Sequence, residues 1–228
     1  MNAIYEHDWD VDISQARAIQ NELRTRLQFR PIPRPIKWIA GADVAYSTTT
    51  RQAVAAVFIM DYETLSIAET TIAIAETNFP YITGYLTFRE APVLLQAFHK
   101  ISIKPDVIMF DGQGIAHPRS MGIASHMGVL LDYPTIGCAK KRLFGEADNP
   151  EQEKGSVAYL SYADDVIGAV LRTRTGVKPV FVSPGHKSTV QDAIELVLRC
   201  AMRYRLPEPT RQAHLLVTDL RSRLCGLV

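Results

Sequence analysis

The stretch Trp38-Ile-Ala-Gly-Ala-Asp-Val-Ala-Tyr46 decides the fold, because it is an apolar run typical of a strand that enters a protein core. Two further strand-like runs follow at residues 53–61 and 66–76, and the short linkers between the three favour antiparallel hairpins. Asp43 is the anomaly, since a carboxylate inside a buried strand is costly unless it is paired or binds a metal. The stretch therefore predicts an antiparallel unit that carries a functional carboxylate.

Helices and short strands surround this unit. The pattern predicts helices at residues 13–27, 88–101, 121–131, 189–203 and 208–224, and further strands at 107–110, 135–138, 157–162, 166–172 and 180–182. Three antiparallel strands followed by helix, strand, helix and strand indicate one mixed α/β sheet with helices on both faces. The strands up to Cys138 fit the ribonuclease H-like pattern, and we expect a single domain over residues 1–228.

The charge of the chain is unevenly distributed. The chain has 228 residues, 47% hydrophobic and 21% charged, which excludes disordered and collagen-like classes. Its net charge of +1 argues against a polybasic nucleic-acid binder. However, residues 1–165 carry 15 Lys and Arg against 20 Asp and Glu, whereas residues 166–228 carry 10 against 4. We expect an acidic body that holds a cation and a basic segment that meets phosphate, with a solvated helix face as the alternative for the latter.

The cysteines and the apolar runs bear on the cellular compartment. Cys138, Cys200 and Cys225 are too far apart for a zinc knuckle or a disulfide framework, and buried thiols in a reducing compartment are the expectation. The N-terminus lacks the apolar run of a signal peptide, and the longest strongly apolar run, at 53–60, is too short to span a bilayer. We expect a soluble, cytoplasmic protein with no membrane partner.

Two further carboxylates accompany Asp43. Asp111 ends the apolar run at 107–110, where open α/β sheets place their ligand sites, so the two Asp side chains can converge on one divalent ion. Glu90 is expected in the first turn of a helix, from which it can act as a third acidic ligand. The alternatives are structural: a turn cap for each Asp, and a favourable interaction with the helix dipole for Glu90.

The stretch Asp111-Gly-Gln-Gly-Ile-Ala-His-Pro-Arg119 is the most informative one in the chain. Gly112 and Gly114 allow the backbone to approach a ligand closely. His117 and Arg119 add a titratable base and a phosphate-binding fork a few residues from a predicted metal ligand. The stretch lacks the spacing of a dinucleotide fingerprint.

Other polar and aromatic segments flank these residues. The turn at 78–84 is able to wedge between stacked bases, and an aromatic plug over the core is the alternative. Residues 139–142 bring Lys and Arg side chains to the same end of the sheet, and residues 183–187 are expected to open a helix that favours anions. His214 lies alone on the last helix, where a structural role is the commoner one.

Taken together, several stretches resemble the endonuclease V family. They are Gly41-Ala-Asp43, Pro80-Tyr-Ile-Thr-Gly84, Phe88-Arg-Glu90, Asp111-Gly-Gln-Gly-Ile-Ala-His-Pro-Arg119, Gly122-Ile-Ala-Ser-His126, Pro134-Thr-Ile-Gly137, Ala139-Lys-Lys-Arg-Leu143, Gly185-His186 and Arg205-Leu-Pro-Glu-Pro-Thr-Arg211. The match runs in order from about residue 12 to His214. One departure is Thr83, because the family's wedge motif usually has a second proline there, and we expect a looser turn.

The resemblance implies a ribonuclease H-like fold and a Mg²⁺-dependent endonuclease, with Mn²⁺ able to replace Mg²⁺. Such enzymes recognise deoxyinosine, the product of adenine deamination, and hydrolyse the second phosphodiester bond 3′ to it, leaving 3′-hydroxyl and 5′-phosphate ends. By the match, Asp43, Asp111 and Glu90 ligate the metal and act in catalysis together with Lys140 and His214. Lesion recognition falls to wedge and loop residues: Pro80, Tyr81, Ile82, Gly84, Gly112, Gly114, His117 and Arg119.

The expected partner is DNA containing deoxyinosine, with single-stranded or inosine-containing RNA substrates as further options, and the protein is expected to be a monomer. Two other functions compete with this interpretation. A non-catalytic nucleic-acid-binding module with the same fold would have no reason to keep three buried acids. A metal-dependent phosphatase of small substrates would have no use for Tyr81.

Overall fold

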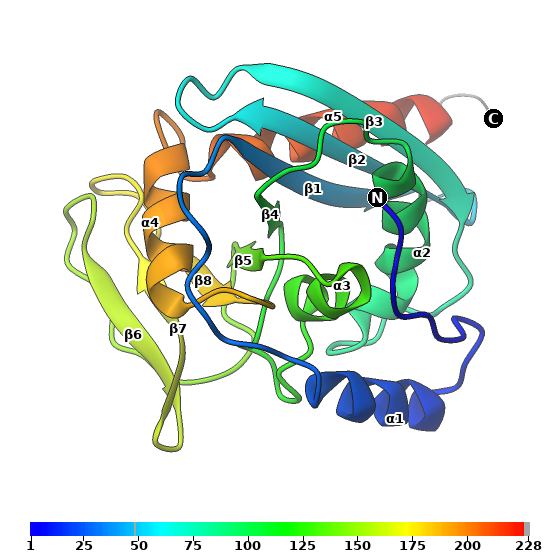
Figure 1. Ribbon diagram of the computed structural model, residues 1–228, viewed down its shortest axis with the longest axis horizontal. Coiled ribbons are helices and arrows are strands. Elements are labelled where there is room, and N and C mark those ends of the chain that lie inside the picture. The colour runs from blue at the N-terminus through cyan, green and yellow to red at the C-terminus, as the bar shows by residue number, and fades with distance from the viewer. Residues whose placement is uncertain (48, 226–228) are drawn as a thin grey trace.

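The computed structural model describes residues 1–47 and 49–225. They form one eight-stranded mixed sheet and the helices around it (Figure 1). Along the sheet the strands follow the order β3-β2-β1-β4-β5-β8-β7-β6. The strands are β1 (Trp38–Tyr46), β2 (Gln52–Asp61), β3 (Ile67–Glu76), β4 (Val107–Phe110), β5 (Thr135–Ala139), β6 (Val157–Tyr162), β7 (Asp165–Leu171) and β8 (Val180–Pro184). The helices are α1 (Ile13–Arg24), α2 (Leu86–His99), α3 (Ile123–Leu131), α4 (Val190–Cys200) and α5 (Glu208–Cys225).

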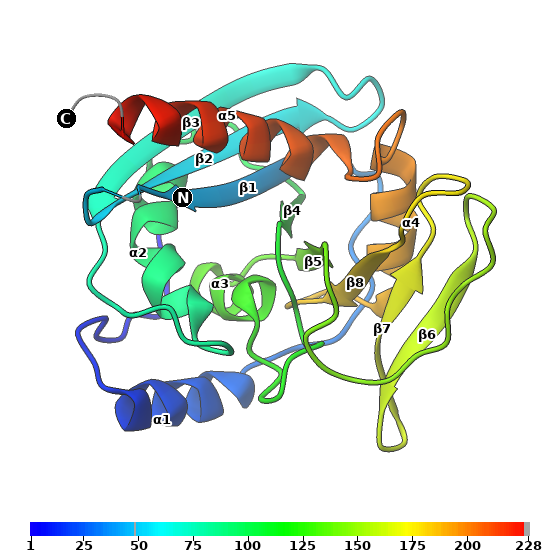
Figure 2. The same ribbon diagram turned by 180° about the vertical axis from the view of Figure 1, so that it is seen from behind.

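Apolar side chains cover both faces of the sheet. In β1, Ala40 and Ala42 pack with residues of α2 and α3, whereas Ile39 and Ala45 belong to a second cluster with α4 and α5. This alternation follows from the two-residue period of a strand. Figure 2 shows α5 lying along β1 and β2. Because helices cover both faces, β2 is buried everywhere except at its two ends, which explains its long unbroken apolar run.

The three central strands create the functional edge. β1 pairs antiparallel with β2 but parallel with β4, and β4 pairs parallel with β5. The carboxyl ends of these three strands therefore point in one direction, which is where α/β sheets bind ligands. The antiparallel β8, β7 and β6 extend the sheet beyond β5.

The structure confirms the α/β class and the helices and strands expected from the sequence, with shifted ends. Two local predictions are wrong. Residues 183–187 do not open a helix, because Ser183 and Pro184 end β8 and α4 begins only at Val190, after the Thr189 cap. Glu90 lies beyond the first turn of α2, because that helix begins at Leu86.

Cys138 and Cys200 are buried free thiols, whereas the Cys225 side chain lies outside the described residues. Within residues 1–47 and 49–225, no helix combines the length and the apolar character needed to cross a membrane.

Candidate active site

Parallel pairing of β1 with β4 brings Asp43 and Asp111 together. The register places Ala42 opposite Phe110, and the Asp111 backbone N–H donates to the Ala42 carbonyl at 3.2 Å. Asp43 follows Ala42 and Asp111 follows Phe110, so the two carboxylates meet where β4 ends. Asp43 also accepts a bond from its neighbour's backbone, Val44, at 2.8 Å.

α5 supplies the third member of this group through a close approach to β1. A Cβ atom on Gly41 would lie 2.1 Å from the Pro209 carbonyl carbon, so only glycine lets α5 pack here. His214 follows on the same helix, and its Nδ1 donates to Asp43 Oδ2 at 2.8 Å. The isolated position of His214 on a helix favours a structural role, whereas the family resemblance implies a catalytic one; the structure places His214 beside Asp43.

Three ligand atoms, one each from Asp43, Asp111 and His214, lie within 4.8 Å of one another. Lys140, just after β5, donates from Nζ to Asp111 Oδ2 at 2.5 Å, and the same Nζ lies 3.4 Å from His214 Nδ1. His214 and Lys140 are 42% and 35% exposed, whereas the side chains of Asp43 and Asp111 are nearly buried. The group thus has one open side, from which a substrate can approach.

Glu90 approaches the two Asp residues from α2, which packs on the other face of β1 from α5. It is only 9% exposed and is not part of the group within 4.8 Å. Burial, and then the Asp43 carboxylate, raise the pKa of Glu90 well above its usual range. Glu90 is therefore a carboxyl group that a nearby cation would help to ionise.

The charges of the site are unbalanced toward acid. Burial and then the nearby Asp43 raise the pKa of Asp111, and Lys140 opposes that shift. The hydrogen bond to Asp43 raises the pKa of His214. Crowded carboxylates of this kind repel one another, and a divalent cation among them would relieve the repulsion. Carboxylate oxygens suit both Mg²⁺ and Mn²⁺, so Asp43, Asp111 and Glu90 fit the metals that the family resemblance implies.

A cavity of about 110 Å³ lies beside the acids, and Gly84, Gly112, His117, Ile123 and Leu143 are among its lining residues. Two of its glycines are needed for steric reasons. Gly84 has a φ of +84°, and a Cβ on Gly112 would lie 2.5 Å from the Ile123 side chain. Because Gly112 follows Asp111 directly, this cavity, here called the recognition pocket, adjoins the candidate metal-binding group of Asp43, Asp111 and His214.

The Gly84 carbonyl is held by three donors. It accepts from Gln20 Nε2 at 3.0 Å, from His117 Nε2 at 3.0 Å and from Arg119 Nη2 at 2.7 Å. His117 Nδ1 accepts from the backbone N–H groups of Arg119 and Met121, which leaves the proton on Nε2. Burial, and then the Arg119 charge, lower the pKa of His117 to about 4, so the ring is neutral at pH 7.

His117 and Arg119 therefore act differently from the titratable base and free phosphate fork that the sequence suggested. Arg119 also donates from Nε to Gln20 Oε1 at 2.5 Å and stacks over the Tyr85 ring. Both side chains are engaged in shaping the turn that contains Gly84. They support the recognition pocket, whereas the Lys140 ammonium group contacts Asp111.

The turn before Gly84 presents one aromatic ring to solvent. Tyr81 is 74% exposed, and Pro80 is exposed beside it. Ile82 instead is half-buried against the cluster of Phe79, Phe88 and their neighbours. The geometry leaves Tyr81 as the side chain able to insert between bases.

Gly114 does not line the recognition pocket. A Cβ there would lie 2.0 Å from the Pro184 carbonyl oxygen, so this glycine allows the loop to pack against β8. Many cations of the basic segment also serve the fold. Arg172 donates to three backbone carbonyls and Arg205 to two. Because these side chains are engaged inside the fold, they are not available to bind phosphate as the sequence suggested.

Sequence reasoning missed three polar residues. Gln20 looked like part of an ordinary amphipathic helix, although it is fully buried and holds Gly84. Gln113 lines the recognition pocket, and its buried Oε1 has no partner within the described part of the chain. Tyr46 lies on the α2 face, and its buried hydroxyl faces the Glu90 carboxyl and the Arg89 side chain. Only Gln113 carried a signal, its place between two glycines.

Comparison with known proteins agrees with this geometry. The endonuclease V family model matches residues 19–215. Endonuclease V of Methanothrix thermoacetophila is 50% identical over 210 residues, which cover 92% of each chain. The crystal structure of endonuclease V from Streptomyces avermitilis has a TM-score of 0.90 at 39% identity and covers 98% of this chain and 99% of that one.

A more distant structure carries nucleic acid. Ciona intestinalis endonuclease V, in complex with a 24mer DNA containing an inosine followed by a ribo-adenosine, has a TM-score of 0.81 at 26% identity, covering 93% of this chain and 98% of that one. The family model and the relatives each span most of the sequence described above. On this evidence the chain belongs to the endonuclease V family.

Proposed function

We propose that this protein is a Mg²⁺-dependent endonuclease that recognises deoxyinosine in DNA and hydrolyses the second phosphodiester bond 3′ to it. The observation that carries the proposal is that Asp43, Asp111 and His214 group within 4.8 Å, directly beside a pocket of about 110 Å³. A pocket of that size suits one extruded base, not a larger ligand. The inosine-containing DNA bound to the Ciona relative supports the same substrate class.

Asp43 and Asp111 would hold the ion through carboxylate oxygens, and Glu90 would add a third acidic group from the α2 side. When bound, Mg²⁺ would supply Lewis-acid activation of a water and neutralise charge on phosphate oxygens. Lys140 places a cation on the open side of the acids, where it can stabilise charge that develops on phosphate. His214 is held by Asp43, so its second ring nitrogen is free to meet substrate or solvent.

Recognition would rest on the fixed backbone around the pocket. Hypoxanthine lacks the amino group of guanine, so walls formed by Gly84 and Gly112 can read its edge at close range. The unpartnered Gln113 Oε1 adds a hydrogen-bond acceptor to that wall. Tyr81 would fill the space that the extruded nucleotide leaves in the stack.

A nicking assay on a 5′-labelled duplex with one inosine tests the proposal. We expect a Mg²⁺-dependent nick whose product length places the cut at the second bond 3′ to inosine. Asp43→Ala and Asp111→Ala should abolish nicking but keep binding, whereas Asp164→Asn, which removes an exposed carboxylate elsewhere, should leave both intact. Binding without nicking under Mg²⁺ and Mn²⁺ would support the non-catalytic alternative, and equal nicking of an inosine-free duplex would refute the role of the pocket.

The remaining details of this function concern its substrate range and setting. We propose that inosine in single-stranded DNA or in RNA is accepted as well, that the protein acts as a monomer, and that it works in the cytoplasm, where buried thiols such as Cys138 and Cys200 persist. Competition between DNA and RNA strands in the same assay and the mass measured by light scattering test the first two points.

A further inference from the structure

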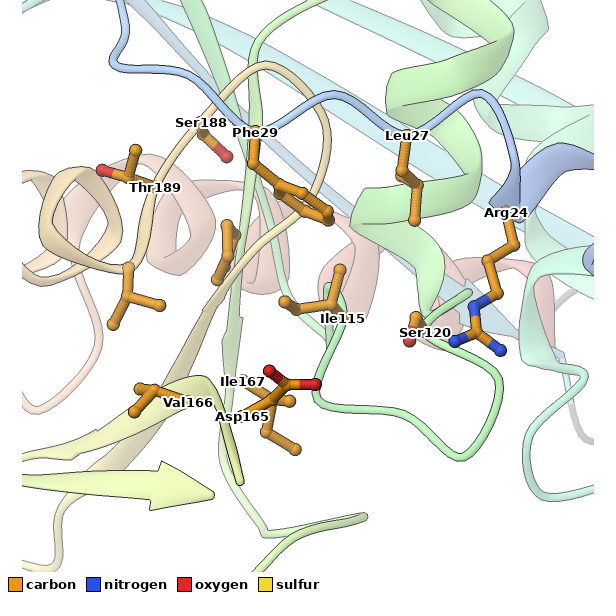
Figure 3. Close-up of a pocket in the computed structure, with 12 residues that line it drawn as sticks. Arg24, Leu27, Phe29, Ile115, Ser120, Asp165, Val166, Ile167, Ser188 and Thr189 are labelled. Carbon is orange, nitrogen blue, oxygen red and sulfur yellow. The ribbon is translucent and has the colours of Figure 1, made fainter. Parts of the chain in front are cut away.

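A second, larger cavity shares the loop of residues 112–122 with the recognition pocket, and Figure 3 shows the side chains that line it. Its volume of about 450 Å³ is within the range of small-ligand sites, about 300–1,000 Å³. Apolar side chains form most of its wall: Leu27, Phe29, Ile115, Val166, Ile167 and Pro184. We call it the Phe29 cavity. No residue assigned above to the metal-binding group lines it.

One loop separates the two cavities. Residues 112–122 contribute Gly112, Gln113 and His117 to the recognition pocket and contribute Ile115 and Ser120 to the Phe29 cavity. The loop begins next to Asp111 and runs away from it toward α1. A strand that enters the recognition pocket and is cut on its 3′ side at Asp111 would therefore continue on its 5′ side toward the Phe29 cavity.

Guanidinium groups mark this path. Arg24 lines the cavity near Ser120, as Figure 3 shows, and among the described residues it makes no ion pair. Arg17 precedes it by seven residues, two helical turns, and so lies on the same face of α1. Gln20, which bonds Arg119, follows Arg17 by three residues on that face of α1, and the Arg17 charge contributes to the lowered pKa of Arg119 after burial. Cations thus lead from the recognition pocket to the cavity, and they are well suited to position phosphates.

The wall of the cavity suits an unstacked base. Phe29 is 56% exposed at its border, and an exposed aromatic ring is a platform on which any base can stack. The Asp165 carboxylate lies beside Ile115 and apart from Arg24 (Figure 3), and it would repel a phosphate there. The opposite charges of Arg24 and Asp165 orient a nucleotide, with its phosphate at Arg24 and its base between Phe29 and Ile115.

We propose that the Phe29 cavity binds one unstacked nucleotide of the substrate strand on the 5′ side of the lesion, and that Arg17 and Arg24 guide the intervening phosphates. This inference rests on the proposed function, because it takes the inosine in the recognition pocket as its anchor. It adds a second base-binding site to the protein and predicts that substrate length on the 5′ side matters.

The test uses the full-length protein and single-stranded oligonucleotides that carry one inosine and from zero to eight nucleotides 5′ of it. Binding is measured by fluorescence anisotropy without divalent cations, so that no strand is cut. We expect the affinity to rise about tenfold at one extension length, since stacking of a base on an aromatic ring accounts for an effect of this size. Phe29→Ala should remove that step, and Arg24→Gln should reduce the slope of log affinity against log salt by about 0.7, the value for one phosphate contact on a single strand.

Arg26→Gln is the matched control, because it removes a charge from the same helix end but from a side chain that pairs with Glu22 at 3.2 Å and stacks on Tyr5. Neither the step nor the salt slope should change in this variant. A smooth dependence on length, or a step that survives Phe29→Ala, overturns the proposal. Failure of the proposed function is distinguishable, because the shortest oligonucleotide would then bind no better with inosine than with adenine.

Discussion

Gly41→Ala should impair catalysis without touching any group of the active site. The added Cβ would lie 2.1 Å from the Pro209 carbonyl carbon, whereas ordinary contact begins at 3.4 Å, so α5 must retreat by about 1.3 Å. His214 lies on the same helix, and the 2.8 Å bond from its Nδ1 to Asp43 would lengthen beyond hydrogen-bond range. Overpacking of this kind costs about 1–3 kcal/mol of unfolding free energy.

The catalytic effect can be separated from the loss of stability. A displacement of about 1 Å at a catalytic group costs on the order of 100-fold in rate, so we expect kcat to fall by about that factor. The KM for a single-stranded inosine substrate should change little, because the recognition pocket contains no residue of α5. Steady-state kinetics, at a temperature where circular dichroism shows the variant to be folded, measure both values, and single-turnover kinetics check that the chemical step is the one slowed.

The double variant Gly41→Ala/His214→Ala decides whether the effect passes through His214. If it does, the double variant should be about as slow as His214→Ala alone, because a residue already removed cannot be displaced. Fully multiplicative losses would refute the reasoning, and so would a Gly41→Ala variant with normal kcat.

Three further predictions concern single side chains. Burial and the Arg119 charge lower the pKa of His117 to about 4, so its neutral ring stabilises the fold above pH 6.5. About 3 kcal/mol of the free energy of unfolding should be lost as the pH falls from 6.5 toward 4, and urea unfolding of His117→Gln should not show this loss. Tyr81→Ala, at a residue 74% exposed, should change stability by less than about 0.5 kcal/mol but slow nicking of an inosine duplex more than of a single strand, and equal slowing would contradict a wedge. Tyr46→Phe removes a buried hydroxyl that faces the Glu90 carboxyl and Arg89 and should destabilise the protein by about 1 kcal/mol in thermal unfolding; unchanged or raised stability would show that the hydroxyl contributes no hydrogen bond.

Features that interrupt a local pattern were predictable from the sequence. Asp43 stands inside an apolar strand and Asp111 ends another, and parallel pairing of the two strands then brings the carboxylates together. The strands and helices themselves follow from local periodicity, which is why all were predicted with errors only at their ends. Such errors still matter, because the true start of α2 at Leu86 moves Glu90 out of the first turn.

Features that depend on distant partners were not predictable. Gly112 and Gly114 look alike in the sequence. In the structure, Gly112 packs against Ile123 and lines the recognition pocket, whereas Gly114 packs against Pro184 and does not line it. His117 and Arg119 have the chemistry of a base and a phosphate fork, yet their partner is a carbonyl more than 30 residues earlier in the chain. A solitary His214 became informative only when α5 was placed against β1.

The distribution of charge along the sequence also gave the wrong place for the expected phosphate contacts. The basic segment after residue 165 suggested phosphate contacts, but Arg172 and Arg205 satisfy backbone carbonyls inside the fold. The Arg24 guanidinium, which makes no ion pair within residues 1–47 and 49–225, instead lies in the acidic part of the chain, on the helix whose buried Gln20 holds the Gly84 carbonyl. The same face of α1 thus braces the recognition pocket through Gln20 and offers the cations of Arg17 and Arg24. A helix with both connections cannot shift without altering both, so base recognition and the path of the strand on its 5′ side should be coupled through α1.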